Sequence, residues 1–282
     1  FAARRTTKTI DGVAVSGWFT EDLTLAELKT LRARERLPRL RSTRFDGQLE
    51  VPTFDEVLDL VAAANARLGR VGPDRIGVYP ETKHPTYFAS VGLALEPPLL
   101  AALRRHGLDA ADAPVFIQSF ETANLQALAR ETRVPLVQLA EAHGRPYDLS
   151  VKRDPRAYAD LLTPAGLASI ARYARAIGVE KSLVLPRDAA NRLGPATPLV
   201  ADAHRAGLLV HVWTLRAENE FLPAGLRRGD DPAAHGDLAG EATLFLRAGV
   251  DGTFTDNPAE GVAARDAFLA LPASERRERP AQ

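Results

Sequence analysis

The segment Tyr79-Pro80-Glu81-Thr82-Lys83 places a carboxylate and an ammonium group two residues apart, directly after a short apolar run. A carboxylate at the end of a strand can ligate a hard divalent cation through oxygen. A lysine two residues further on points to the same side of an extended chain and can neutralise a phosphate. Glu81 and Lys83 therefore predict a site for a metal and a phosphate, or a surface ion pair, and the spacing alone leaves both open.

Two further apolar runs carry side chains that could serve a site. Gln118, near the end of the run 115–120, could orient a polar ligand or satisfy hydrogen bonds within a sheet. His211 and Trp213 alternate along another run, so both face one side of the predicted strand. Trp213 could form an apolar wall for a glycerol-sized group, whereas His211 is either a site residue or a hydrogen-bonded core histidine.

Other polar candidates favour structural roles. Asp256 precedes a helical pattern and is a natural helix cap. A glycosidase that uses Glu81 and Glu218 as its carboxylate pair stays an alternative function. It would need the two carboxyl groups about 5 to 10 Å apart in one cleft. Five histidines show no metal-ligand spacing such as HxxxH, namely His84, His106, His143, His204 and His235.

Composition excludes several function classes. Lys plus Arg equal Asp plus Glu at 36 each, so no net field steers the chain to nucleic acid or to an anionic membrane. There is no cysteine, and therefore no disulfide, no cysteine metal site and no thiol nucleophile. No apolar run reaches the roughly 18 residues that a membrane span needs. Any phosphate recognition must come from a local site.

The absence of methionine bears on the start of the chain. Phe1 is too large for removal of an initiator methionine before it, and the first ten residues do not resemble a signal peptide. We therefore expect a further segment upstream of Phe1.

Short apolar runs alternate with helical patterns, which is typical of βα units and a parallel sheet. Start and stop signals predict a helix from Thr53 to Leu68, ended by Gly69. Helices are also expected to open at Pro97, at Thr163 (running to Ile177-Gly178), at Thr197, at Asp237 and at Pro258. The predicted strands are residues 76–80, 115–120, 135–140, 182–185, 208–214 and 252–255.

The number of these units indicates the fold class. Six βα units over residues 53–282 fall two short of the closed (β/α)8 TIM barrel. An open doubly wound sheet is the alternative, but no Gly-rich phosphate loop follows any strand. Residues 1–52 are expected to form a long βα loop with one short helix over 24–33, begun by a capping box. We therefore expect an α/β TIM barrel, 1–282 as a single domain, from which the first two βα units are missing.

Several phrases, taken in order, resemble a known family. VYPETKHP, VFIQSFET, LVQL, LLVHVWTLRAENEFLP and AGVDGTFTDNPAEGV are similar to successive strand ends of the glycerophosphodiester phosphodiesterases, especially their bacterial periplasmic or secreted branch. The resemblance covers essentially the whole chain. It implies a barrel of the PLC-like phosphodiesterase type with one divalent metal, Ca²⁺ or Mg²⁺. It also implies hydrolysis of glycerophosphodiesters to an alcohol and sn-glycerol 3-phosphate, and a periplasmic or secreted location.

The resemblance also implies roles for single residues. By position, Glu81 is a metal carboxylate, Lys83 contacts the substrate phosphate, and Gln118, Phe120 and Trp213 line the substrate pocket. The family's catalytic histidine pair and Glu-x-Asp metal pair are absent, which agrees with two missing units, so no catalytic residue is assigned within this chain.

We expect the 282 residues alone to be inactive and poorly folded, because an open barrel exposes two strand edges. Two alternatives stay open beside a glycerophosphodiester phosphodiesterase. One is a related barrel phosphodiesterase acting on other lipid-derived phosphodiesters. The other is a catalytically dead barrel used for binding.

Overall fold

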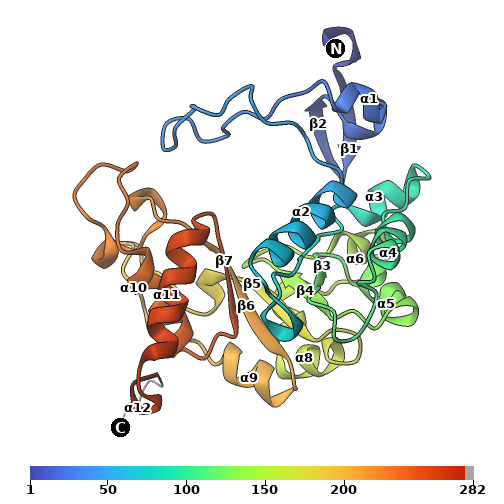
Figure 1. The fold of residues 1–282 in the computed structure, drawn as a ribbon. Helices are drawn as coiled ribbons and strands as arrows, with labels where there is room; N and C mark the ends of the chain where they lie inside the picture. The colour runs from blue at the N-terminus through green and yellow to red at the C-terminus, as the bar shows by residue number, and fades with distance from the viewer. Residues whose placement is uncertain (277–282) are drawn as a thin grey trace. The chain divides into compact units, whose positions relative to one another are not determined.

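A computed structural model of the chain describes residues 1–276. They fall into two compact units, divided between Pro135 and Leu136, and Figure 1 labels their helices and strands. The single barrel domain expected over 1–282 stays a prediction.

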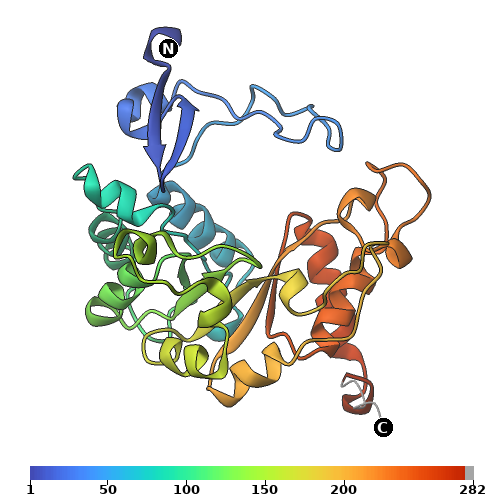
Figure 2. The same cartoon turned by 180° about the vertical axis from the view of Figure 1, so that it is seen from behind.

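The first unit opens with an antiparallel hairpin, so the expectation of a loop was wrong for residues 6–17. β1 (Thr6–Ile10) pairs with β2 (Val13–Gly17). The turn residues Asp11 and Gly12 have φ of 51° and 80°, as in the type I′ turn that Asp-Gly favours. This dipeptide between β-branched runs was the signal that could have predicted the hairpin. In both views the hairpin lies beside α1 (Leu25–Leu28) (Figures 1 and 2).

Two helices of this unit begin as their sequences predict. Thr24 and Thr53 each form a capping box, with Glu27 and Glu56, although α1 is shorter than the expected 24–33. Gly69 follows α2 with φ 62°, which confirms its predicted end. The helices after α1 are α2 (Phe54–Arg67), α3 (Pro85–Ser90), α4 (Glu96–Arg105) and α5 (Thr122–Glu131), with 3₁₀ turns at Ala2–Arg4, Thr20–Asp22 and Gly72–Asp74.

The predicted strand at 76–80 is an extended segment with isolated parallel bridges. Val78 pairs with Val115, and Glu81 pairs with Gln118, which lies in β3 (Ile117–Ser119). A Cβ at Gly77 would lie 2.1 Å from the Pro114 carbonyl oxygen. Glycine therefore permits the close approach that brings Glu81 beside β3.

The second unit contains four parallel strands that neighbour one another in sequence order. They are β4 (Leu136–Ala140), β5 (Ala176–Glu180), β6 (Leu209–Leu215) and β7 (Gly252–Thr255). The predictions for 135–140, 208–214 and 252–255 are confirmed. Every residue of β4 is buried, as expected for a parallel sheet covered on both faces.

Helices follow these strands (Figure 1). Asp237 caps α10 by accepting a hydrogen bond from the Gly240 backbone N–H, as predicted. No helix within residues 1–276 has the length and apolar character needed to span a membrane. The helices are α6 (Tyr147–Val151), α7 (Tyr158–Leu161), α8 (Pro164–Ile170), α9 (Leu199–Arg205), α10 (Leu238–Arg247), α11 (Pro258–Ala270) and α12 (Ala273–Arg276), with 3₁₀ turns at Lys181–Leu183, Asn219–Phe221 and Ala224–Leu226.

The fourth strand was predicted in the wrong place. Residues 182–185 fall in and just after a 3₁₀ turn, and the strand is β5, where a helix was expected to run to Ile177-Gly178. A Cβ at Gly178 would lie 2.5 Å from Leu139 Cδ2, so this glycine makes room for β4 and does not end a helix. The apolar residue Val184 is fully buried although it lies outside any strand. Short apolar runs cannot be assigned to strand or helix by periodicity alone.

Candidate functional site

The segment that carries Glu81 alternates in exposure as its two-residue spacing predicts. Thr82 is 3% exposed, whereas Glu81 and Lys83 are exposed. Lys83 forms no ion pair within 4 Å among residues 1–276. Its ammonium group is therefore available to an anion from outside the chain.

A buried polar network fixes Thr82 and thereby its two neighbours. The Thr82 backbone N–H donates to the Gln118 carbonyl at 3.0 Å, and its hydroxyl accepts from Asn124 Nδ2 at 2.7 Å. Ser119 Oγ donates to the Thr82 carbonyl at 3.2 Å. Buried hydrogen bonds of this kind rigidify a site. The bonds of Thr82 therefore fix the backbone from which Glu81 and Lys83 project.

Glu81 lines a cavity of about 580 Å³ whose other walls come largely from α4, including Pro98 and Leu99. The charged residues Asp55 and Arg105 also line it. Desolvation raises the pKa of Glu81, and the nearby positive charges of Lys83 and His84 oppose that rise. A carboxyl group whose charge the fold disfavours is a candidate for function, because a cation would relieve the penalty.

The described residues do not by themselves complete a metal site. No group of three or more His, Asp or Glu side chains within residues 1–276 could hold a metal ion. Divalent calcium or magnesium takes six or more oxygen ligands. Glu81 can therefore supply one ligand, and the rest would have to come from other groups.

The structure brings four of the five predicted site residues to the carboxyl ends of two neighbouring segments. Gln118 is 8% exposed and bridges to Glu81, and Phe120 follows β3 and is half-buried. Carboxyl ends of parallel strands are where such folds gather functional groups. Glu81, Lys83, Gln118 and Phe120 form this strand-end cluster of the first unit.

Trp213 lies in the second unit, on β6. It is half-buried, stands opposite Glu180 in the register of β5, and donates from Nε1 to the Gly178 carbonyl at 3.1 Å. The indole ring is thus held by the strand next to it. Its role in a substrate pocket stays a prediction.

His211 is a core histidine. It stands between Gly178 of β5 and Gly252 of β7 in the sheet register, and a Cβ at Gly252 would lie 2.7 Å from its ring. The residue is 8% exposed, and its ring occupies the space that Gly252 leaves. Burial lowers the pKa of His211, and Asp251 partly opposes this.

This burial predicts how stability depends on pH. Above the unfolded pKa near 6.5, His211 is neutral in both states. As the pH falls toward the lowered folded pKa, only the unfolded state takes up a proton, so stability is lost at about 1.4 kcal/mol per pH unit over that window. Urea unfolding between pH 7 and 5 should show a shallower loss in His211→Gln than in the parent. His143→Gln, at an exposed position, should keep the parental slope, and equal slopes in all three proteins would contradict the assignment.

The sequence did not reveal several polar groups. Glu121 is 3% exposed and accepts from the Thr86 backbone N–H at 3.3 Å and from its hydroxyl. His84 pairs with Asp11 at 2.6 Å, across 73 positions of the chain. No local spacing could indicate either contact.

Asp256 is not the predicted helix cap. The residue before α11 is Asn257, and the Asp256 carboxylate accepts from Arg216 Nε at 2.8 Å. The Arg216 guanidinium also lies 4.7 Å from the centre of the Phe221 ring. Asp256 therefore ties the end of β7 to the residue that follows β6. The prediction failed because a cap and an ion-pair acceptor use the same residue types.

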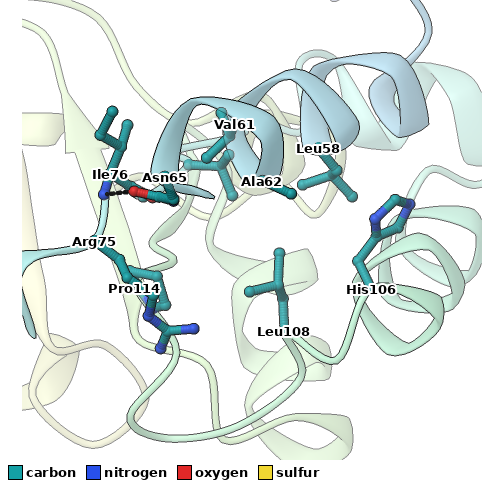
Figure 3. Close-up of a pocket in the computed structure, with 11 residues that line it drawn as sticks. Leu58, Val61, Ala62, Asn65, Arg75, Ile76, His106, Leu108 and Pro114 are labelled. Carbon is teal, nitrogen blue, oxygen red and sulfur yellow. Dashed lines mark hydrogen bonds between the residues drawn. The ribbon is translucent and has the colours of Figure 1, made fainter. Parts of the chain in front are cut away.

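A second cavity, of about 250 Å³, lies between α2 and the start of the segment that ends in Glu81 (Figure 3). Leu58 and Leu108 line it, and the Asn65 side chain exchanges two hydrogen bonds with the Ile76 backbone, at 2.7 and 2.9 Å. The amino ends of parallel strands serve stability more than chemistry. We therefore assign the site to the other end of this segment.

Comparison with known proteins identifies the family of the chain. The family model described as "Glycerophosphoryl diester phosphodiesterase family" matches residues 3–260. Glycerophosphodiester phosphodiesterase GDPD6 of Arabidopsis thaliana is 33% identical over 270 residues, which are 91% of this chain and 66% of that protein. A glycerophosphodiester phosphodiesterase of Treponema pallidum is 26% identical over 283 residues, covering 91% of this chain and 73% of that protein.

The chain spans only part of some curated relatives, 66% of GDPD6 and 31% of GDPDL1 from the same plant. Among solved structures, a candidate glycerophosphoryl diester phosphodiesterase from Silicibacter pomeroyi aligns with a TM-score of 0.59 at 18% identity, over 94% of this chain and 77% of that chain. At this identity the likeness shows a shared α/β fold.

Proposed function

Because this chain belongs to the glycerophosphoryl diester phosphodiesterase family, we propose that the protein containing it hydrolyses glycerophosphodiesters to an alcohol and sn-glycerol 3-phosphate. The family match over residues 3–260 carries the proposal. The strand-end cluster supports it, since it offers a carboxylate, a cation without an ion pair and a buried amide at one edge. Family membership also removes the glycosidase alternative with Glu81 and Glu218.

In this proposal each predicted residue has a distinct role. Lys83 binds a phosphodiester oxygen through charge, and Gln118 and Phe120 line the pocket beside it. Trp213, in the second unit, keeps its predicted role in substrate binding. Glu81 is one oxygen ligand of a divalent ion, Ca²⁺ or Mg²⁺, whose other ligands lie outside the described residues. When bound, such an ion stabilises charge that develops on the phosphoryl oxygens.

We place the catalytic histidine pair outside this chain, in the two βα units that would complete a (β/α)8 barrel. The contacts of the histidines in the described residues are consistent with this proposal. His211 is in the core, while four others each contact a carboxylate within 4 Å: His84, His106, His204 and His235.

Exposure of the first unit supports the same proposal. Leu58 is the one buried residue of α2, and Leu60 on the same helix is 69% exposed. Ile76 is 37% exposed, although strands of a complete parallel barrel are covered on both sides. Further chain packed on α2 and on the segment at 76–81 would bury this apolar surface.

The proposal that the catalytic histidine pair lies outside this chain is tested by comparing the full-length protein with residues 1–282 expressed alone. The full-length protein should hydrolyse glycerophosphocholine and the fragment should not. Metal-dependent turnover by the fragment would refute the assignment of the histidine pair to other residues. Absence of turnover in both, with retained binding of the diester, would favour a binding barrel.

The same assay separates substrate classes. Release of glycerol 3-phosphate from glycerophosphocholine should exceed hydrolysis of other lipid-derived phosphodiesters at equal concentration. A reversed preference would favour the related phosphodiesterase. We further propose a periplasmic or secreted location, on the resemblance to that branch, and detection of the protein only in the cytosolic fraction of its source cells would contradict it.

A further inference from the structure

The loop that carries Lys83 ends in a strained residue. His84 has φ 56° and ψ 46° and precedes α3 as its N-cap. The left-handed region costs a non-glycine residue about 1–2 kcal/mol. The following residue, Pro85, further restricts the backbone of His84. Such a conformation persists only where the surrounding structure imposes it, and it is common at functional sites.

The contact that holds His84 comes from the hairpin tip. His84 Nδ1 donates to Asp11 Oδ2 at 2.6 Å, and Asp11 is itself left-handed at φ 51°. The side chains are 37% and 26% exposed. Two strained residues from segments far apart in sequence thus meet in one short, charge-assisted hydrogen bond.

Asp11 has a second unusual feature. Its other carboxylate oxygen, Oδ1, is buried without a hydrogen-bond partner among the described residues. An unsatisfied buried acceptor costs about 1–3 kcal/mol. At this contact the hairpin therefore carries both a strained backbone and an unsatisfied oxygen. Both features cost stability, and the turn itself does not require the unsatisfied oxygen.

The contact closes a frame around Lys83. On its amino side, Thr82 is fixed by Gln118 and Asn124. On its carboxyl side, His84 is fixed by Asp11, and the Thr86 backbone and hydroxyl are held by Glu121. Lys83 is the residue between these fixed points, and its side chain is exposed.

We infer that Asp11 is a positioning residue which, through His84, holds the Lys83 loop in the conformation that binds the phosphate of the substrate. This inference rests on the proposed function. It gives the β1–β2 hairpin a role in substrate binding that its exposed position does not suggest.

The test uses Asp11→Gly in the full-length protein. Glycine keeps the positive φ of the turn and removes the carboxylate. We expect KM for glycerophosphocholine to rise roughly tenfold, within the range that a hydrogen bond to a charged group contributes, while kcat changes less than threefold. Asp11→Asn, which also tolerates the turn and retains an acceptor, should recover part of the KM.

A double-mutant cycle with His84→Gly tests whether the two residues act as one device. The double variant should resemble either single variant, because both remove the same bond. Thr7→Ala is the matched control, since Thr7 bonds Ser16 at 2.6 Å on the exposed face of the same hairpin, and it should keep the parental KM. Additive effects, an unchanged KM in Asp11→Gly, or an equal rise in Thr7→Ala would overturn the inference.

A binding measurement separates this inference from the proposed function. If the wild-type protein hydrolyses no diester, the proposed function fails. Calorimetric titration with inorganic phosphate then decides the inference alone. Roughly tenfold weaker binding by Asp11→Gly supports it, and equal affinity in both proteins overturns it.

Discussion

Replacing Glu81 by glutamine in the full-length protein should lower kcat/KM for glycerophosphodiester hydrolysis by roughly a thousandfold. Glutamine keeps the shape of the side chain but removes the charge that would hold a divalent ion. Loss of such a charge costs several kcal/mol of transition-state stabilisation, and each 1.36 kcal/mol is about tenfold in rate.

The free energy of unfolding should not fall together with the activity. Although Glu81 as a whole residue is exposed, partial desolvation of its carboxyl group raises its pKa, so the folded state disfavours its charge. Glu81→Gln should therefore leave the free energy of unfolding unchanged or slightly increased. Lost activity with unimpaired stability is the pattern expected of a site residue.

Glu50→Gln is a suitable control, because Glu50 is an exposed residue of the same unit that pairs with Arg32 at 3.3 Å. It should keep both activity and stability. If Glu81→Gln retains more than a third of parental kcat/KM, or if it unfolds the protein, Glu81 is not the proposed ligand.

The largest expected effect on stability lies in the second unit, at Glu241. Its side chain is fully buried on α10, and its Oε1 accepts from Lys181 at 2.7 Å and from Arg187 at 2.8 Å. Both cations also donate to the Phe221 carbonyl. Glu241 thus ties α10 to the segment that follows β5, and the two cations tie that segment to the loop before α10.

Glu241→Gln should lower the free energy of unfolding by about 3–5 kcal/mol, because two cations would lose their common buried carboxylate. Desolvation already lowers the pKa of Lys181 although Glu241 opposes it, so the pair depends on that carboxylate. Guanidinium unfolding measures the loss. Glu260→Gln removes a surface pair with His235 at 3.1 Å and should cost at most about 1 kcal/mol. A loss below 1 kcal/mol in Glu241→Gln would show that the cluster is not structural.

Local signals predicted those elements that local physics determines. Thr53 and Gly69 bound α2 as expected, because a capping box and a left-handed glycine depend on a few neighbouring residues. The strand-end placement of Glu81 and Gln118 followed from parallel βα alternation. Both predictions required only short stretches of sequence within the helix or strand concerned.

Other features depend on distant parts of the chain. Gly178 reads as a helix end, and only its packing against Leu139 shows that it belongs to a strand. The Asp11–His84 contact joins a turn to a loop that no sequence period relates. Desolvation by the folded chain raises the pKa of Glu81, and Glu81 shares a cavity with residues of α2 and α4. The sequence therefore indicated which groups could act, but not which side chains hold them.

One measurement tests the central proposal most directly: release of sn-glycerol 3-phosphate from glycerophosphocholine by the full-length protein, before and after chelation with EDTA. We predict that release is abolished by EDTA and restored by adding back Ca²⁺ or Mg²⁺. Absence of release from intact, folded protein, or release that EDTA does not diminish, would contradict a metal-dependent glycerophosphodiester phosphodiesterase.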